Sequence, residues 1–261
     1  MAPETPPGVS GPLPRVAVSI VSHGHGGMVQ TLVERLLDCP SVSQIIVTRN
    51  IPETYRFESR ERIEVLENRK PLGFGANHNQ AFKSCRQPFF CILNPDIEIS
   101  EDPFPALLAT LQRHRLALVA PRIMTPGGDT EDSFRYFPSA ASLVAKALYH
   151  QEGRFRYDPA AMTVFPDWVA GMFMLIPDRE FSAIGGFDES YFLYYEDVDL
   201  CARLRLAGKG IGVDLTVSAT HRARRSSRRD LGHMRMHMAS MVRYLWRYRG
   251  VAIHAPNGDK S

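Results

Sequence analysis

The sequence predicts an α/β protein, with a mainly parallel, doubly wound sheet, flanking helices and a C-terminal helical extension. Three observations lead to this class. Short β-branched runs alternate with helix-like segments through the first hundred residues, the pattern of a parallel sheet. One run, 89–93, ends abruptly in Asn94-Pro95-Asp96, as a buried strand does at the carboxyl edge of such a sheet. Near the C-terminus, apolar residues recur at helical spacing.

Each element is predicted from its own residues. The strands are short apolar runs, and the helices repeat apolar residues at intervals of three or four. In chain order we expect strands at 16–21, 44–47, 63–66, 89–93, 117–120, 168–176 and 210–217, and helices at 28–37, 76–83, 103–113, 178–184, 196–206 and 235–249. Residues 125–156 hold Gly, Pro and polar clusters, and are expected to form loops over a substrate site.

Length and composition limit the class of protein. A chain of 261 residues with 44% hydrophobic and 23% charged residues is ordinary for a soluble globular protein. No run approaches the roughly 20 apolar residues that span a bilayer, and the N-terminus lacks a signal-peptide pattern. The four cysteines show no paired spacing. We therefore expect a cytoplasmic protein with reduced cysteines, built from a flexible tail (1–14), a main domain (15–220) and a basic helical extension (221–261).

The segment 185–204 is the most informative part of the chain. It opens on a Gly-Gly pair, mixes five carboxylates with five aromatic side chains, and closes on a helical pattern. Glu196, Asp197 and Asp199 fall in the first turn of the expected helix, where unpaired backbone N–H groups favour anionic side chains. A carboxylate here, walled by aromatic rings, suits a general base. The alternative is an N-cap cluster beside an aromatic core.

Three segments carry a family resemblance. They are Leu72 to Gln80, Asn94-Pro95-Asp96 and Glu196-Asp197. In this order they resemble the Gly-rich nucleotide loop, the Asp-x-Asp metal motif and the Glu-Asp base motif of family 2 glycosyltransferases of the GT-A fold. The nearest members by motif are bacterial rhamnosyltransferase-like enzymes of cell-surface polysaccharide synthesis, and the resemblance spans about residues 15–227.

The resemblance implies an inverting enzyme that uses a nucleotide-sugar donor. Asp197, with Glu196, would take the proton of the acceptor hydroxyl. Asp96 would hold Mg²⁺ or Mn²⁺, hard ions that accept few protein carboxylates and several phosphate oxygens. His221 stands where a family histidine can complete the metal shell, although a lone histidine is more often structural. The residues expected to bind substrate lie in loops near the nucleotide or diphosphate: Ser22, His23, Asn50, Gly73, Phe74, Asn77, Asn94, Arg222 and Arg225.

The charge distribution points to anionic partners. Residues 221–249 contain nine arginines and one aspartate, a local charge of +8, which leaves −5 for the rest of a chain whose net charge is +3. We expect a nucleotide-sugar donor and a glycan or lipid-linked acceptor. Nucleic acid is not expected, because 221–229 lacks interleaved aromatics and a known module. For 235–249, contact with the inner face of the plasma membrane and a plain packed helix stay equal alternatives.

Two other functions remain open. A nucleotidyltransferase also combines a nucleotide-binding sheet with carboxylates and Mg²⁺, but it should carry a Gly- and Lys/Arg-rich loop after the first strand, where this chain has His23 and His25. The second alternative is a non-catalytic nucleotide-sugar binding protein on the same fold. It would explain why Arg49 stands where the family has an aspartate. That replacement also leaves the identity of the nucleotide open. Retention of Asp96 and Asp197 argues against that reading. Rhamnose is the first candidate sugar by resemblance only, and the linkage stays open.

Overall fold

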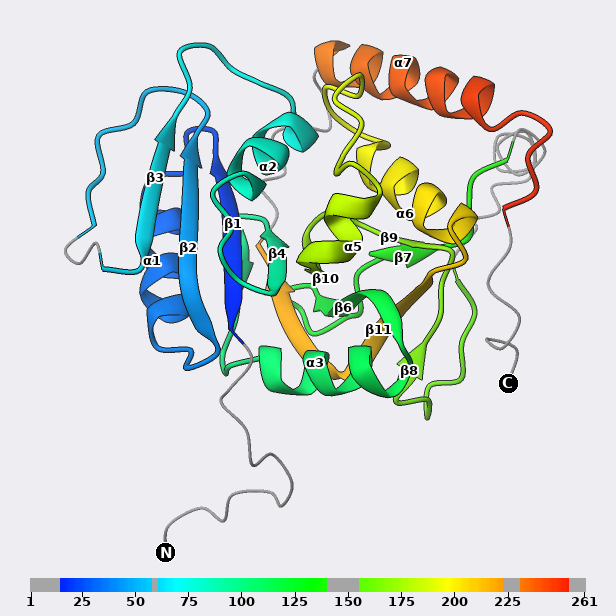
Figure 1. The fold of residues 1–261 in the computed structure, drawn as a ribbon, viewed down its shortest axis with the longest axis horizontal. Helices are drawn as coiled ribbons and strands as arrows, with labels where there is room; N and C mark the ends of the chain where they lie inside the picture. Colours follow the sequence, from blue (N-terminus) through cyan, green and yellow to red (C-terminus); the bar gives the residue numbers. More distant parts are fainter. Residues whose placement is uncertain (1–14, 58–60, 140–154, 223–230, 254–261) are drawn as a thin grey trace, which may run out of the picture.

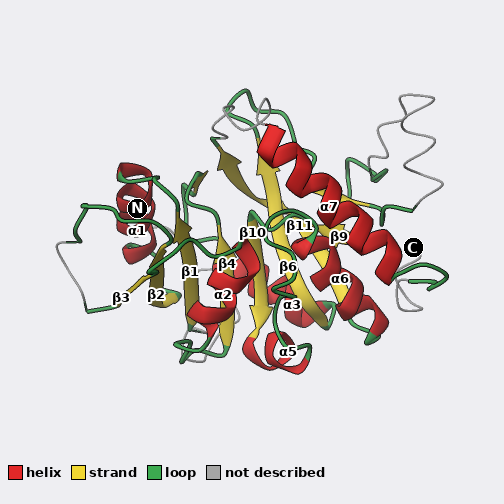
Figure 2. Ribbon diagram, turned by 90° about the horizontal axis from the view of Figure 1, so that it is seen from above, coloured by secondary structure: helices red, strands yellow, loops and turns green. Residues whose placement is uncertain are grey.

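A single large sheet crosses the molecule, with helices on both of its faces (Figures 1 and 2). The computed structural model describes residues 15–57, 61–139, 155–222 and 231–253. The expected tail at 1–14 and Arg225 lie outside the described residues. The strand order is β3-β2-β1-β4-β10-β6-β11-β5, with β8 paired to β11, and β7 and β9 form a separate two-stranded sheet.

The element bounds follow the expected order. The strands are β1 (Val16–Ser22), β2 (Val42–Arg49), β3 (Ile63–Glu67), β4 (Phe89–Leu93), β5 (Ile97–Glu98), β6 (Leu116–Met124), β7 (Phe134–Arg135), β8 (Thr163–Val164), β9 (Trp168–Val169), β10 (Phe173–Pro177) and β11 (Gly210–His221). The helices are α1 (Gly27–Leu37), α2 (Phe74–Phe82), α3 (Phe104–Arg113), α5 (Asp178–Ala183), α6 (Glu196–Leu206) and α7 (Leu231–Arg247).

Strand β1 shows why these residues form a doubly wound sheet. It pairs in parallel with both β2 and β4, so both of its edges are hydrogen-bonded and it lies inside the sheet. Val18 and Ile20 pack with α1 and α3 on one face, whereas Ala17 packs with α2, α5 and α6 on the other. Each fully buried Ile or Val contributes about 1.5–3 kcal/mol to folding. The α/β class expected from the sequence is confirmed.

The expected strand at 168–176 is wrong in its continuity. It is two strands, β9 and β10, separated by Ala170–Met172. In addition, β10 runs antiparallel to its neighbours β4 and β6, so its direction is opposite to that of the other central strands. The break is where Gly171 approaches other chain segments closely. The small strands β5, β7 and β8 were not expected, because two-residue strands carry no measurable periodicity.

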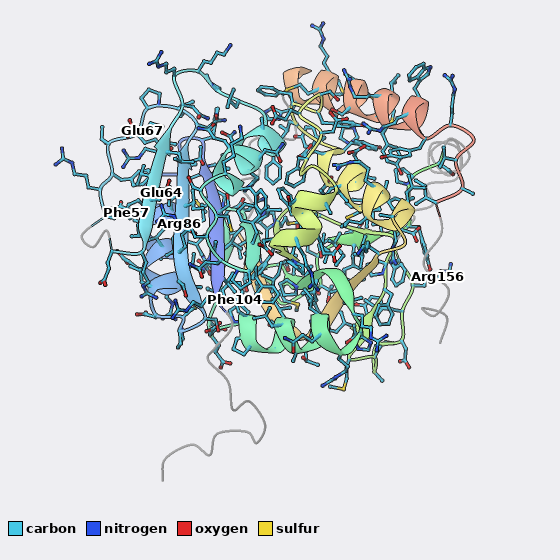
Figure 3. All side chains as sticks on the ribbon, in the orientation of Figure 1. Phe57, Glu64, Glu67, Arg86, Phe104 and Arg156 are labelled. Atoms are coloured by element: carbon cyan, nitrogen blue, oxygen red, sulfur yellow. The ribbon has the colours of Figure 1, made fainter. Side chains whose placement is uncertain are left out.

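Strand β3 is one end strand of the sheet and β5 is the other, whereas the C-terminal helix α7 lies outside the sheet against α6. On β3, Glu64 accepts a hydrogen bond from Ser84 Oγ (2.6 Å) and lies 3.6 Å from Arg86, at the margin of the molecule (Figure 3). Helix α7 lies along the upper edge of the molecule, above α6 (Figure 1), and it packs on α6 with Tyr244 buried between them. It begins four residues before the expected start. The division into two domains at residue 220 stays a prediction, and His221 still belongs to strand β11.

Two further features of the structure are the state of the cysteines and the lengths of the helices. Cys39, Cys91 and Cys201 are buried, Cys85 is half-buried, and all four are free. Within the described ranges, every helix is too short or too polar to cross a membrane.

Candidate active site

The turn before α6 holds an unusual backbone. Tyr194 and Tyr195 have φ values of 69° and 66°, in the left-handed region that bulky residues avoid. Such a conformation costs about 1–3 kcal/mol per residue and persists where neighbours enforce it. Helix α7 supplies the neighbours, since Ser240 Oγ donates to Leu193 O (2.9 Å) and Tyr194 Oη lies 3.1 Å from His233 Nδ1. The strained turn delivers Glu196 and the next residue to the start of α6.

Asp197 is partly exposed and has an oriented carboxylate. Its Oδ2 accepts a hydrogen bond from Gly171 N (3.0 Å), and its Oδ1 accepts one from Val198 N (2.8 Å). Burial raises the pKa of Asp197 above its ordinary value, although these backbone donors act in the opposite direction. The group can therefore take up a proton more readily than a surface aspartate, as a general base must.

Glu196 has a different environment. The side chain is 5% exposed, and its Oε2 is buried without a hydrogen-bond partner in the described part of the chain. Burial, and next the charge of Asp197, raise the pKa of Glu196 well above its ordinary value. A carboxyl held so strongly toward its neutral form keeps its proton, and the negative charge of the pair then resides on Asp197.

The second carboxylate centre lies beyond the end of β4. His221 Nε2 is 3.2 Å from Asp96 Oδ2, and His221 Nδ1 is 2.8 Å from Glu131 Oε2. Burial acts to lower the pKa of His221, but the carboxylates of Asp96 and Glu131 outweigh it and raise that pKa. Strand pairing explains the approach, because β11 pairs with β5 just after Asp96.

The residues at this centre fit a divalent ion only in part. Asp96 Oδ1 is buried and has no hydrogen-bond partner among the residues that the structure describes, as a carboxylate oxygen reserved for an ion would be. Over the described residues, no group of three or more His, Cys, Asp or Glu is placed to hold a metal by itself. A metal here would need further oxygens from a bound ligand.

Two consecutive residues immediately before β10 connect the two centres. Gly171 N binds Asp197, and Met172 O accepts a hydrogen bond from Asn94 N (2.9 Å). A Cβ on Gly171 would lie 3.1 Å from the Phe74 ring and 3.7 Å from Asp197 Cβ, so only glycine fits here without displacement. Asp197, the Asn94-Pro95-Asp96 turn and the loop at Phe74 therefore meet at one edge of the sheet.

The loop before α2 approaches the turn before α6 through Gly73. A Cβ on Gly73 would lie 2.6 Å from Phe192 O, and Phe74 N donates to the same oxygen (2.9 Å). The Phe74 ring packs edge-on against His78 (4.5 Å between centroids). His78 is buried, lies 2.8 Å from Ser19 Oγ, and has its pKa lowered to about 3 by burial. It is therefore a neutral part of the core beneath the loop.

Asn50 ties together three loops at the same edge. Its Oδ1 accepts hydrogen bonds from Leu72 N (2.8 Å) and Asn68 Nδ2 (2.9 Å), and its Nδ2 donates to Leu72 O (2.9 Å). The His23 ring lies 3.2 Å from Asn50 Nδ2. Asn50 N also donates to Ser22 O, at the end of β1 (2.8 Å). Ser22 and Asn50 are buried, so they shape this edge of the sheet.

Asn77 lies one turn into α2 and is fully buried. Its Oδ1 accepts a hydrogen bond from Asn68 Nδ2 (2.6 Å), and its Nδ2 donates to Gly73 O (2.9 Å). The expected contact of Asn77 with base or ribose stays a prediction, but in this structure the side chain fixes the shape of the loop.

A cavity of about 610 Å³ opens beside Asp96, between α1 and the strand pair β5–β11. Such a volume falls within the usual range of small-molecule sites. Arg222 lines it, donates its backbone N–H to Asp96 O (2.8 Å), and pairs its guanidinium with Glu98 (2.5 Å). Arg222 therefore lies beside the carboxylate centre, and its contact with substrate stays a prediction.

Comparison with known proteins identifies the class of this site. Residues 47–176 match the model of glycosyl transferase family 2. The rhamnosyltransferase WbbL of Escherichia coli K12 is 29% identical over 247 residues, covering 90% of this chain and 94% of that protein. The chain belongs to the family 2 glycosyltransferases. Further similarity is seen to the N-acetylglucosaminyl-diphospho-decaprenol L-rhamnosyltransferase of Mycobacterium tuberculosis, 30% identical over 59% of this chain and 53% of that protein.

Solved structures confirm the GT-A fold of this glycosyltransferase. GalNAc-T7, solved with UDP, GalNAc and Mn²⁺, superposes with a TM-score of 0.62 at 13% identity, over 80% of this chain and 43% of that one. The mannosyltransferase PcManGT of Pyrobaculum calidifontis, solved with GDP-Man and Mn²⁺, gives 0.58 at 12% identity, over 88% and 64%. Both neighbours contain a divalent cation, consistent with metal dependence among GT-A enzymes.

Sequence reasoning missed three residues of the glycosyltransferase site. Glu131 lies in a stretch expected to be loops, and nothing in its local pattern marks it as the partner of His221. Gly171 and Met172 fall inside an apolar run. The glycine could have drawn attention to this place, because a glycine within a strand pattern often marks close backbone approach.

Proposed function

We propose that this glycosyltransferase transfers a sugar from a nucleotide diphosphate donor to a hydroxyl of a glycan or lipid-linked acceptor, with inversion at the anomeric carbon. Rhamnose is the first candidate sugar, because the relatives in Escherichia coli and Mycobacterium tuberculosis are rhamnosyltransferases. The name of the mycobacterial relative contains a polyprenyl diphosphate acceptor. This favours a lipid-linked acceptor for the present chain and a role in surface polysaccharide synthesis.

One observation carries the proposal: Gly171 and Met172 bring the Asp197 carboxylate and the Asn94-Pro95-Asp96 turn to one edge of the sheet. In the reaction, the acceptor oxygen attacks the anomeric carbon while Asp197 takes its proton. The bond from that carbon to the diphosphate oxygen breaks, and the diphosphate leaves with the electron pair. Attack opposite the leaving group inverts the carbon. Glu196, kept neutral by burial, leaves the charge on Asp197.

We assign Asp96 and His221 as the residues that would hold Mg²⁺ or Mn²⁺. A bound divalent ion supplies charge stabilisation to the departing diphosphate. Glu131 orients His221 from the other side of its ring, as an outer carboxylate does for many metal-ligating histidines. The support is the unpartnered Asp96 Oδ1 and the cavity beside it.

The residues of the loops near the donor fall into two groups, those that contact the donor and those that hold the loops in place. We assign His23, Phe74, Asn94 and Arg222 to contact with the donor, and Ser22, Asn50, Gly73 and Asn77 to holding the loops. Arg225 remains a proposed diphosphate contact by its position in the sequence. We place the enzyme in the cytoplasm, at the inner face of the membrane.

A donor screen tests the proposal. The full chain is incubated with Mn²⁺, a set of UDP-, GDP- and dTDP-sugars, and N-acetylglucosaminyl diphosphate linked to a short polyprenol, and product is followed by mass spectrometry. Transfer of one sugar from one donor class is expected. Nucleotide binding without any transfer would support a non-catalytic protein, and transfer of a nucleotidyl group would support the nucleotidyltransferase alternative.

A further inference from the structure

Helix α7 carries an exposed apolar stripe. Met234, Met238, Val242 and Trp246 recur every four residues and are 58%, 49%, 58% and 68% exposed. With Val251 they make five of the nine exposed large hydrophobic side chains among the described residues, so exposed apolar surface is concentrated on this one segment. Contiguous apolar surface of this kind marks an interaction site more often than scattered exposed residues do.

The opposite face of α7 is fixed against the body of the protein. Tyr244 is buried beside Tyr195 (5.5 Å between ring centroids), and Tyr248 Oη donates to Asp199 Oδ1 (2.8 Å). Ser240 Oγ donates to Leu193 O. These contacts set the rotation of the helix, so the apolar stripe must face outward.

The charge on the outward face is of one sign. Helix α7 contains no aspartate or glutamate. Arg247 is occupied, because it pairs with Asp188 and lies 3.5 Å from Asp199. Arg235, Arg243 and Arg249 are exposed, and the Arg249 guanidinium lies 4.5 Å from the centre of the Trp246 ring. The face therefore combines methionine, valine and tryptophan with cations, the composition of helices that lie in the interface of an anionic bilayer.

The position of α7 relates this face to catalysis. In Figure 1 the helix lies at the upper edge of the molecule, the edge toward which the arrows of β2 and β3 point. The active site lies at the same carboxyl edge, and α7 braces the turn that carries Asp197. A bilayer in contact with α7 would therefore lie on the active-site side of the protein.

We propose that the outward face of α7, formed by Met234, Arg235, Met238, Val242, Arg243 and Trp246 with Arg249, binds the surface of an anionic lipid bilayer. Contact there presents the active site to a hydroxyl acceptor carried by a lipid in that bilayer. This second statement rests on the proposed function, whereas the membrane contact does not.

Co-sedimentation of the full chain with vesicles tests the contact. One set of vesicles is phosphatidylcholine alone, and in the other about a third of the lipid is phosphatidylglycerol. Binding to the anionic set, falling steeply as salt rises, is expected, since each arginine near such a surface contributes about a fivefold increase in binding. Met238→Ser with Trp246→Ser, and separately Arg235→Gln with Arg249→Gln, should each lower binding at least about tenfold.

Matched controls lie outside the helix. Met162 is 62% exposed and Arg113 is exposed at the end of α3, so Met162→Ser and Arg113→Gln should leave vesicle binding unchanged. Circular dichroism and nucleotide affinity confirm that all variants are folded. Vesicle binding by the α7 variants equal to that of the parent chain would overturn the proposal. So would a dimer in light scattering that Trp246→Ser disperses, because the face would then belong to a second copy.

The transfer assay separates this inference from the proposed function. If transfer occurs, the α7 variants should lose activity on a lipid-linked acceptor in anionic vesicles but keep it on a water-soluble analogue of the same glycan. Equal loss on both acceptors would overturn the presentation of a lipid-borne acceptor. If no acceptor is used at all, the proposed function fails, and the vesicle measurement still decides the membrane contact.

Discussion

Replacement of Asp197 by asparagine is the sharpest test of the proposed chemistry. The amide is nearly isosteric with the carboxylate but cannot accept the acceptor proton. Loss of one general base lowers rates by about 10²–10⁴-fold, equivalent to about 2.7–5.5 kcal/mol of activation free energy. Donor affinity should change little, since the proposed base acts on the acceptor.

The structure also predicts a cost in stability for this substitution. Both carboxylate oxygens of Asp197 accept backbone N–H groups, from Gly171 and Val198. An asparagine offers one oxygen, so one of these two donors would face an amide NH₂ group. A buried donor left without a partner costs about 1–3 kcal/mol. Because each kcal/mol corresponds to about 2–4 °C in Tm for a domain of this size, the assay temperature must stay well below the melting transition.

The assay compares the initial rate of product formation and donor affinity by calorimetry for the parent, Asp197→Asn and Glu196→Gln. The second substitution makes the same chemical change at the neighbouring carboxyl, and it should lower the rate less because burial already keeps Glu196 neutral. An Asp197→Asn enzyme that retains activity within a factor of a few would refute the assignment of the base. A larger loss in Glu196→Gln than in Asp197→Asn would reverse the roles of the two residues.

Three further results are expected. Asp96→Ala should lower donor affinity at least about tenfold with Mn²⁺ and change it little under EDTA, and parent affinity and turnover unaffected by EDTA would contradict the metal assignment. Glu196→Gln should raise Tm relative to the parent increasingly as the pH rises above the ordinary glutamate pKa of 4.5, because a folded-state pKa raised above the unfolded value costs the parent stability as pH rises between the two values; parallel Tm curves would exclude this. Gly73→Ala should lower donor affinity and Tm, since its Cβ would lie 2.6 Å from Phe192 O, whereas Gly27→Ala, with open space around it, should be tolerated.

Much of the fold and the two carboxylate centres could be predicted because of one geometric rule. The carboxyl ends of parallel strands meet at one edge of the sheet, so Asn94-Pro95-Asp96, ending one such run, had to lie there. The direction of β10 could not be predicted, because an apolar run is equally buried whichever way it points. That direction matters, since it places the first residues of β10, and with them Gly171, at the active-site edge.

The loops after β1 and β2 show a second limit of sequence reasoning. Arg49 replaces a family aspartate, and the structure turns its side chain to Glu67 (2.8 Å) and over the Tyr55 ring (4.6 Å). A carboxylate reaches the same edge from another position, because Glu53 accepts hydrogen bonds from Gly24 N (3.1 Å) and Gly26 N (2.9 Å). Such a contact depends on how the loop folds back, which no motif encodes.

The first turn of α6 shows why residue type alone could not assign roles. Its three carboxyls look equivalent in the sequence but have different surroundings. Glu196 is buried without a partner for one oxygen, Asp197 is oriented by two backbone donors and partly open, and Asp199 is fully buried between Arg203 Nε (2.8 Å) and Tyr248 Oη (2.8 Å). Asp199 therefore joins α6 to α7, which in turn holds the strained turn that positions Asp197. The geometry around the proposed base thus depends on a helix that the sequence suggested only as a C-terminal extension.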